Sequence, residues 1–338
     1  MIADPIAVVG PGRMGIGIAT AVLLADRGHP VILIDTKKRP PGRETAALEN
    51  ARREIQGNLE LLESLGLLAS DAQLLMGGLT VQRGLNQAVA ACSFVFEALP
   101  EKVALKQEFY RSIGPLLKED AVIASATSTF HLDVFWEVCS RPGNILCAHW
   151  LNPAFLIPLV EVAHGEQTSR WAPDQMCDFL RSIGKIPVKM KTRPGFIVPR
   201  IQAAAMNEAI RILEEGATTA QEIDTAIKAG FGFRLGVMGL IEFVDLGGVD
   251  ILYHAGGYLH EKLGGEHFKP PRLVTEKMDK AETGPRTGKG FYDYTGVDLQ
   301  NLFNKKYLGF VELLDLYRRS KHLNFSGGIG GDKRKEMP

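Results

Sequence analysis

The sequence predicts an α/β domain with a doubly wound, mostly parallel sheet, followed by an all-α C-terminal domain. Strand-like apolar runs alternate with helical segments up to about residue 190. Beyond Arg193-Pro194-Gly195, helical segments follow one another without strands. The expected domains are therefore residues 1–192 and 193–320. A disordered tail is expected over 321–338, because that stretch is poor in apolar residues.

In the first domain, Ile6–Val9 and Val31–Asp35 are predicted strands, joined by a helix from about Met14 to Arg27. This βαβ unit implies a right-handed crossover between parallel strands. An amphipathic helix is expected over residues 44–68, where so long an insertion predicts a solvated arm. Four later strands and a final helix and strand complete the domain: Phe94–Phe96, Ala121–Ala124, Ile145–Ala148, Leu159–Val162, then Asp174–Gly184 and Ile186–Lys189.

The second domain is expected to be helical throughout. A capping box of Thr219 and Glu222 precedes a predicted helix over Ile223–Ala229. The other expected helices cover residues 196–215, 238–255, 273–280 and 299–318.

Composition narrows the function classes. The chain has 338 residues, 45% of them hydrophobic, which suits two domains with sizeable cores. Lys+Arg and Asp+Glu number 39 each, so the overall charge favours neither nucleic acid nor an anionic membrane as a partner. The four cysteines are far apart, and neither a disulfide nor a metal site is expected. No signal segment or long apolar run is evident, which predicts a cytoplasmic protein.

A glycine-rich motif marks the candidate cofactor site. Gly10-Pro11-Gly12-Arg13-Met14-Gly15 follows a buried strand and opens a helix. Gly10 permits the tight turn, Gly12 lets a pyrophosphate approach the backbone, and Gly15 lets helix and strand pack closely. Asp35 ends the second strand, where a carboxylate accepts hydrogen bonds from ribose hydroxyls and repels a 2′-phosphate. The motif predicts a dinucleotide-binding Rossmann domain, and Asp35 favours NAD over NADP, although Lys37 and Lys38 soften the repulsion.

Three later residues are candidates for catalysis. Ser128 follows one expected strand, His149 ends another, and Glu161 lies within a third, where a carboxylate is costly without a partner. Ligands of open parallel sheets bind at the carboxyl ends of the strands, so Ser128 and His149 are expected beside the nicotinamide. Each has an ordinary alternative, since His149 can be a satisfied core residue and Ser128 can cap a helix.

Seven motifs in a fixed order resemble the L-3-hydroxyacyl-CoA dehydrogenase family, over roughly residues 5–295. They are GPGRMG, FEALPE, ATSTF, HWLNP, LVEV, PGFIV and TGKGFYDY. The resemblance implies a Rossmann domain with a helical domain that forms a homodimer. It also implies NAD-dependent oxidation of an L-3-hydroxyacyl-CoA, an acyl-CoA-type substrate, to the 3-oxoacyl-CoA.

The resemblance also implies residue roles. His149 would take the hydroxyl proton, with Glu161 orienting its ring, and Ser128 would hydrogen-bond the reacting oxygen. The nicotinamide ribose would meet Glu97 and the nicotinamide would meet Asn152. Further cofactor contacts would come from Lys102 and Arg286, besides Arg13 and Met14 of the glycine motif.

Two departures from the family pattern concern the substrate. Ala126 and Pro199 stand where the family has asparagine, so the pocket is expected to be more apolar. The segments 157–161 and 233–239 are more similar to relatives that oxidise free 3-hydroxy acids, the L-gulonate 3-dehydrogenases (lens lambda-crystallins) and carnitine dehydrogenases. In that alternative Arg234 pairs with a substrate carboxylate, unless it serves an interface or surface ion pair. A crystallin-like protein without catalysis is the third alternative.

Overall fold

The computed structural model describes residues 4–43, 45–128, 130–320 and 323. The chain divides into two compact units, Met1–Ala205 and Met206–Pro338. The division falls within helix α7 (Val198–Glu214). The domain boundary that the sequence predicts at 192/193 stays a prediction. The tail expected over 321–338 lies outside the described residues, apart from Leu323.

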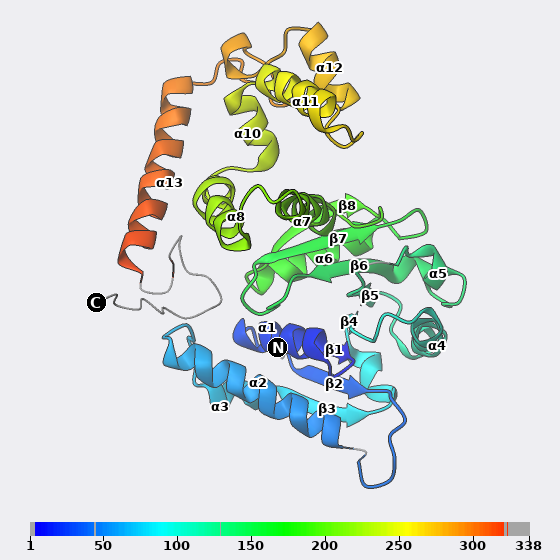
Figure 1. The fold of residues 1–338 in the computed structure, drawn as a ribbon. Helices are drawn as coiled ribbons and strands as arrows, with labels where there is room; N and C mark the ends of the chain where they lie inside the picture. The colour runs from blue at the N-terminus through cyan, green and yellow to red at the C-terminus, as the bar shows by residue number, and fades with distance from the viewer. Residues whose placement is uncertain (1–3, 44, 129, 321–322, 324–338) are drawn as a thin grey trace. The chain divides into compact units, whose positions relative to one another are not determined.

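The first unit is built on an eight-stranded sheet with strand order β3-β2-β1-β4-β5-β6-β7-β8 (Figure 1). All neighbouring strands are parallel except β6 and β7, which are antiparallel. The strand order reverses between β1 and β4, which is where open α/β sheets bind ligands. The strands are β1 (Ile6–Val9), β2 (Val31–Asp35), β3 (Leu79–Arg83), β4 (Phe94–Glu97), β5 (Val122–Ser125), β6 (Ile145–Trp150), β7 (Leu159–His164) and β8 (Ile186–Lys191).

Helices cover both faces of this sheet, which is why its central strands are apolar without alternation. One buried cluster joins the sheet to α1, α2, α3 and α6, and the other joins it to α4 and α5. The helices are α1 (Arg13–Leu24), α2 (Ala46–Ser64), α3 (Ala72–Met76), α4 (Val103–Ile113), α5 (Asp133–Trp136) and α6 (Trp171–Ser182). The expected α/β class, with a parallel sheet in the first unit, is confirmed.

Two details of the first unit differ from the sequence prediction. Helix α2 is present, but it is not a solvated arm, because it buries one face against α1, β2 and β3. The buried residues recur three or four positions apart, which is the spacing of one helix face; they are Leu48, Ala51, Ile55, Leu59 and Leu62. Strand β3 was not predicted, because polar residues alternate with apolar ones along this edge strand.

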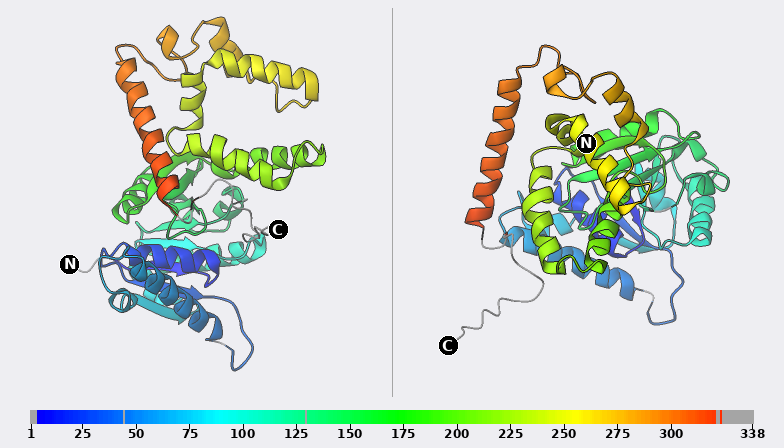
Figure 2. Two further views of the ribbon diagram at one scale, coloured as in Figure 1. Left: turned by 60° about the vertical axis from the view of Figure 1, so that its left-hand side comes forward. Right: turned by 45° about the horizontal axis from the view of Figure 1, so that its top comes forward.

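The second unit is helical, which confirms the expected all-α class. Thr219 caps its first complete helix by accepting a hydrogen bond from the backbone N–H of Glu222 at 3.2 Å. The helix expected over 238–255 is two helices, because Gly248 has φ +108° and breaks it. Figure 2 shows these helices from two further sides. They are α8 (Ala220–Ala226), a π-helical segment (Ile227–Gly232), α9 (Phe233–Leu235), α10 (Leu240–Gly247), α11 (Val249–Leu263), α12 (Arg272–Asp279) and α13 (Leu299–Arg319).

Asp245 anchors the end of the family-like region. Its buried carboxylate accepts hydrogen bonds from the backbone N–H groups of Phe291 (2.9 Å) and Tyr292 (2.8 Å), and from the Tyr294 hydroxyl (3.2 Å).

In the part of the chain that the structure describes, helices long and apolar enough to cross a membrane are absent.

Candidate active site

The three motif glycines meet three different steric demands. Gly10 has φ +112°, and a Cβ there would lie 2.5 Å from the carbonyl oxygen of Ala98. A Cβ on Gly15 would lie 1.9 Å from the carbonyl oxygen of Gly10, so only glycine lets α1 pack this closely on the turn. At Gly12 a Cβ would meet no described atom within 4 Å, which keeps the surface open for a ligand. Helix α1 begins at Arg13, so its first N–H groups are available to a phosphate.

A cavity of about 610 Å³ lies over this turn, at the carboxyl ends of β1, β2 and β4. It brings together six of the predicted cofactor residues, namely Gly10, Gly12, Arg13, Met14, Asp35 and Lys102. The rest of its wall is formed by Pro11, Thr36, Lys37, Arg39, Ala98, Leu99, Pro100 and Leu105. Basic side chains and a helix N-terminus suit a pyrophosphate, and the apolar wall suits an adenine ring. The residues present therefore fit a dinucleotide.

Asp35 is oriented by two donors before any ligand binds. One carboxylate oxygen accepts a hydrogen bond from the Lys37 backbone N–H at 3.0 Å, and the other accepts one from Arg39 Nε at 2.8 Å. Its side chain is 3% exposed. Each carboxylate oxygen has a second lone pair, so both can still accept ribose hydroxyls. The sequence prediction missed Arg39, although a basic residue four positions after Asp35 was the available signal.

Asp35→Ala should weaken NAD binding about 10- to 150-fold, because hydrogen bonds to a charged acceptor contribute roughly 1.5–3 kcal/mol. The affinity for NADP should change less, so the ratio of the NAD affinity to the NADP affinity should fall. Fluorescence titration with both nucleotides measures this directly. Asp4→Ala is the matched control, since Asp4 is also ion-paired, to Lys118 at 2.6 Å, but does not line the cavity. An unchanged preference in Asp35→Ala, or a wild-type preference for NADP, would overturn the assignment.

The antiparallel pairing of β6 and β7 places His149 directly opposite Glu161. Opposite residues of an antiparallel pair point to the same face. His149 Nδ1 lies 2.8 Å from Glu161 Oε2, and His149 Nε2 lies 3.0 Å from Ser128 Oγ. Both side chains of the His–Glu pair are buried. The three predicted catalytic residues thus form one hydrogen-bonded chain.

The second carboxylate oxygen of Glu161 anchors the start of α7. It accepts the backbone N–H groups of Ile197 and Val198, each at 2.9 Å. Burial raises the pKa of Glu161, but the hydrogen bonds from His149, Val198 and Ile197 outweigh it and hold the pKa below its ordinary value. Glu161 is therefore ionised at neutral pH and can only accept, so His149 donates a hydrogen bond to it from Nδ1–H. The neutral imidazole then presents an unprotonated Nε2 toward Ser128.

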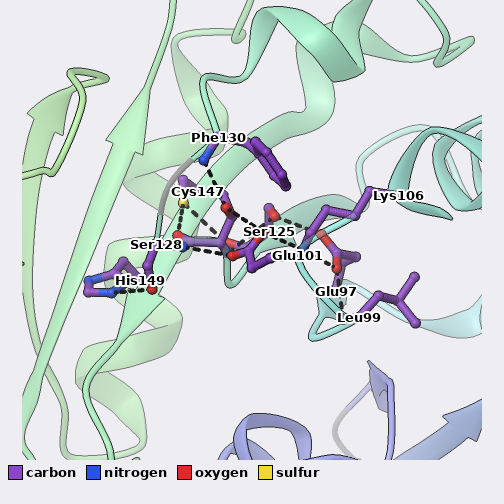
Figure 3. Close-up of polar contacts among 10 residues, drawn as sticks. Glu97, Leu99, Glu101, Lys106, Ser125, Ser128, Phe130, Cys147 and His149 are labelled. Carbon is purple, nitrogen blue, oxygen red and sulfur yellow. Dashed lines mark hydrogen bonds and ion pairs between the residues drawn. The ribbon is translucent and has the colours of Figure 1, made fainter. Parts of the chain in front are cut away.

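Glu97 is not among the residues that line the cavity, and its contact with the nicotinamide ribose stays a prediction. Its side chain is fully buried, paired with the equally buried Lys106 at 2.7 Å. Its carboxylate also accepts the Leu99 N–H at 2.8 Å and the Ser125 hydroxyl at 2.7 Å (Figure 3). The ion pair and these hydrogen bonds together make burial of the Glu97 carboxylate tolerable.

Glu101 is the carboxylate that lies beside the catalytic residues. It is 41% exposed and accepts hydrogen bonds from the Ser128 backbone N–H and the Thr127 hydroxyl, both at 3.1 Å. Lys106 lies 3.7 Å from it, so one buried ammonium serves both glutamates (Figure 3). The sequence prediction missed Glu101, Lys106 and Thr127. The second glutamate of FEALPE was the available signal.

The loop between β6 and β7 carries Asn152, which is exposed and precedes a cis peptide bond to Pro153. Buried Lys185 braces this loop by donating hydrogen bonds to the carbonyl oxygens of Ala154 (2.7 Å) and Ile157 (2.9 Å). Burial lowers the pKa of Lys185 to about 8. The nicotinamide contact of Asn152 stays a prediction.

The remaining predicted residues are not members of the hydrogen-bonded chain. Pro199 is the second residue of α7, in its first turn as expected. In the second unit, Arg234 lies over the Phe243 ring at 5.3 Å, and Arg286 is 72% exposed with Asp250 at 3.5 Å. Their cofactor and substrate contacts stay predictions. Within the described residues, no group of three or more His, Cys, Asp or Glu side chains is arranged to hold a metal ion.

Comparisons with known proteins match most of the chain to one family. The model of the 3-hydroxyacyl-CoA dehydrogenase NAD-binding domain matches residues 5–193, and that of the C-terminal domain matches 195–294. A 3-hydroxybutyryl-CoA dehydrogenase of Clostridioides difficile is 30% identical over 293 residues, covering 86% of this chain and 99% of that protein. The 5-formyl-3-hydroxy-2-methylpyridine 4-carboxylate 5-dehydrogenase of Mesorhizobium japonicum is 31% identical over 291 residues. The match covers 86% of this chain and 90% of that protein.

Among solved structures, a 3-hydroxyacyl-CoA dehydrogenase of Archaeoglobus fulgidus superposes with a TM-score of 0.73 at 30% identity. The match covers 94% of this chain and 98% of the archaeal one. The two domain models together extend over the glycine motif, the Ser–His–Glu chain and the helical unit as far as residue 294. The chain therefore belongs to the NAD-dependent 3-hydroxyacyl-CoA dehydrogenase family.

Proposed function

We propose that this protein oxidises the hydroxyl group of an L-3-hydroxyacyl-CoA to the 3-oxoacyl-CoA, reversibly, with NAD as hydride acceptor. The observation that carries the proposal is the hydrogen-bonded chain from Ser128 through His149 to Glu161. It supplies an oriented base next to a hydroxyl donor, which is what removal of a hydroxyl proton requires.

In the proposed reaction, His149 Nε2 accepts the proton of the substrate hydroxyl as the carbon–hydrogen bond breaks. Ionised Glu161 holds Nδ1–H and stabilises the positive charge that develops on the ring. Ser128 Oγ, 3.0 Å from Nε2, hydrogen-bonds the same substrate oxygen. In the reverse direction the imidazolium returns the proton to that oxygen.

The cofactor would be held by the 610 Å³ cavity. The N–H groups at the start of α1 would bind the pyrophosphate, and Asp35 would accept the adenosine ribose hydroxyls. Arg13 and Lys102 add positive charge to the cavity wall. When bound, NAD supplies the hydride acceptor.

A second candidate is oxidation of the hydroxyl group of a free 3-hydroxy acid, which carries a carboxylate in place of the CoA thioester. The Mesorhizobium japonicum relative is named for a pyridine 4-carboxylate substrate. Exposed Arg234 offers a guanidinium for bidentate pairing with such a group.

An NADH absorbance assay separates the two candidates. The panel is 3-hydroxybutyryl-CoA, free 3-hydroxybutyrate, carnitine, gulonate and 5-formyl-3-hydroxy-2-methylpyridine 4-carboxylate. The proposal expects turnover of the thioester alone. If a free acid is turned over and the thioester is not, the proposed function is wrong and the second candidate takes its place.

Pro199→Asn should change the preference for acyl chain length. With Pro199 and Ala126 in place of polar residues, each additional buried methylene should contribute about 0.8 kcal/mol, so kcat/KM should rise from C4 to longer or aryl-bearing substrates. The asparagine should flatten or reverse that trend. Proline is tolerated in the first turn of α7, where its missing N–H would be unpaired in any case.

A chain-length series on the wild type and Pro199→Asn measures this. If the wild-type protein prefers C4 substrates, the prediction of an apolar substrate pocket is wrong.

We also propose that the protein is a homodimer through its helical unit. All 21 residues of α13 are described and none of them is buried, although the helix is amphipathic. Phe310 of this helix stacks on Phe233 at 5.8 Å, but other apolar side chains of the helix stay exposed, which indicates a partner. The exposed apolar residues of this helix are Tyr307, Leu308, Val311 and Leu316. Light scattering after gel filtration should give twice the mass of the chain, and a monomeric mass would contradict this.

A further inference from the structure

Phe196 has a backbone conformation that is unusual for a residue with a large side chain. Its φ is +44°, and it follows Gly195, whose φ is +75°. Only Asp26 and Ala281 share a positive φ among the described non-glycine residues. The left-handed region is sterically costly for any residue with a Cβ, and such strain persists only where its surroundings impose it. Packing of the Phe196 side chain in the core does not by itself explain this backbone conformation.

The strained turn aims two backbone donors at the active site. It leads from β8 into α7, and the N–H groups of Ile197 and Val198 converge on Glu161 Oε1 at 2.9 Å each. Successive N–H groups after a left-handed residue form a concave anion site. The conformation of Phe196 thus determines where the Glu161 carboxylate is held.

The ring of Phe196 covers one face of His149. The two ring centroids are 5.1 Å apart and the planes differ by 25°, a stacked arrangement. The two nitrogens of His149 are held at the ring edge, Nδ1 by Glu161 and Nε2 by Ser128. Phe196 supplies the third restraint, which is on the plane of the imidazole. An aromatic face also attracts a cation, so the ring stabilises the imidazolium that forms during catalysis.

We propose that Phe196 is a positioning residue that acts on both members of the His149–Glu161 pair. Its ring keeps the imidazole in plane and stabilises the protonated form, while its left-handed backbone presents two N–H groups to Glu161. The proposal rests on the proposed function only in taking His149 as the base. It does not depend on the identity of the substrate.

The test of the ring is Phe196→Leu, which keeps an apolar side chain of similar reach and removes the aromatic face. NMR of ring-labelled histidine follows the protonation of His149, whose signal is identified by its loss in His149→Gln. The titration midpoint of His149 should fall by about half to one pH unit, since the imidazolium loses a cation–π contact. With substrate, kcat should fall by about tenfold while the dissociation constant of NAD stays unchanged. Phe196→Tyr, which retains an aromatic face, should keep the wild-type midpoint.

The matched control is Phe179→Leu. Phe179 is 6% exposed, against 5% for Phe196, and it stacks on Phe94 at 4.4 Å, away from the catalytic chain. Phe179→Leu should lower the melting temperature and leave the midpoint and kcat unchanged. If Phe196→Leu behaves like this control, the ring is only core packing and the proposal is wrong. Phe196→Met takes its place if the leucine variant does not fold. Because the NMR titration uses no substrate, it is decisive even if the proposed thioester is not turned over.

The backbone half of the proposal is tested by comparing Phe196→Gly with Phe196→Ala. Both lose the ring, and they differ in the freedom to adopt φ +44°. Glycine ordinarily destabilises a folded chain relative to alanine because it loses more conformational entropy. At this position the order should be reversed, with Phe196→Gly melting a few degrees above Phe196→Ala. The ordinary order would show that the turn is not strained, and would overturn the role of the backbone.

Discussion

Replacing His149 by alanine is expected to lower turnover by about 100- to 10,000-fold, the range of a single general acid–base group. His149 Nε2 is the nitrogen that faces the Ser128 hydroxyl, 3.0 Å away, while Glu161 holds Nδ1 at 2.8 Å. The dissociation constant of NAD should hardly change, because His149 does not line the cofactor cavity. Steady-state kinetics together with a fluorescence titration of NAD measure both quantities.

His164→Ala is the control for this variant, because His164 ends β7, the strand that carries Glu161, but does not take part in the catalytic chain. Its turnover should equal that of the wild type. Near-wild-type turnover in His149→Ala would mean that another residue is the base.

Glu161→Gln is expected to lower turnover by roughly 10- to 150-fold, which corresponds to the loss of hydrogen bonds worth about 1.5–3 kcal/mol at a charged acceptor. The amide cannot stabilise the imidazolium, so the acidic limb of the pH–rate profile should also move to lower pH. The kinetic measurement is kcat/KM across the pH range. An unchanged turnover and profile would show that the 2.8 Å contact to His149 is not used in catalysis.

The same variant should lose stability, because Glu161 also holds the first N–H groups of α7. Since folding lowers the pKa of Glu161, its contribution to stability is present above the unfolded value and is lost as the pH falls through the folded value. Glutamine does not titrate. The gap in melting temperature between wild type and Glu161→Gln should therefore be largest at neutral pH and shrink below about pH 4.5.

Thermal melts at several pH values measure this gap. Glu261→Gln, at an exposed position on α11, should melt at the same temperature as the wild type at every pH. A gap that persists unchanged into acid would mean that the charge of Glu161 does not stabilise α7.

Several features were determined by the sequence alone, because local physics governs them. The glycine motif is a local steric requirement, and Gly10 and Gly15 show it through the carbonyl oxygens that a Cβ would strike. Buried parallel strands and amphipathic helices follow from apolar periodicity, so seven of the eight strands were expected. The family-like motifs pointed to Ser128, His149 and Glu161, which the fold brings into one hydrogen-bonded chain.

Other features were decided only by the tertiary structure, because they depend on which distant groups meet. Nothing local distinguishes Glu97, which pairs with buried Lys106, from Glu101, which holds the Ser128 backbone. The apolar face of α2 could be predicted from the sequence. That the sheet and α1 cover this face could not be predicted. The partners of Glu161 at the start of α7 lie more than thirty residues away along the chain. They are backbone N–H groups, which every residue but proline carries. Sequence patterns report periodicity and turn chemistry, whereas the partner of a buried charge is fixed by long-range packing.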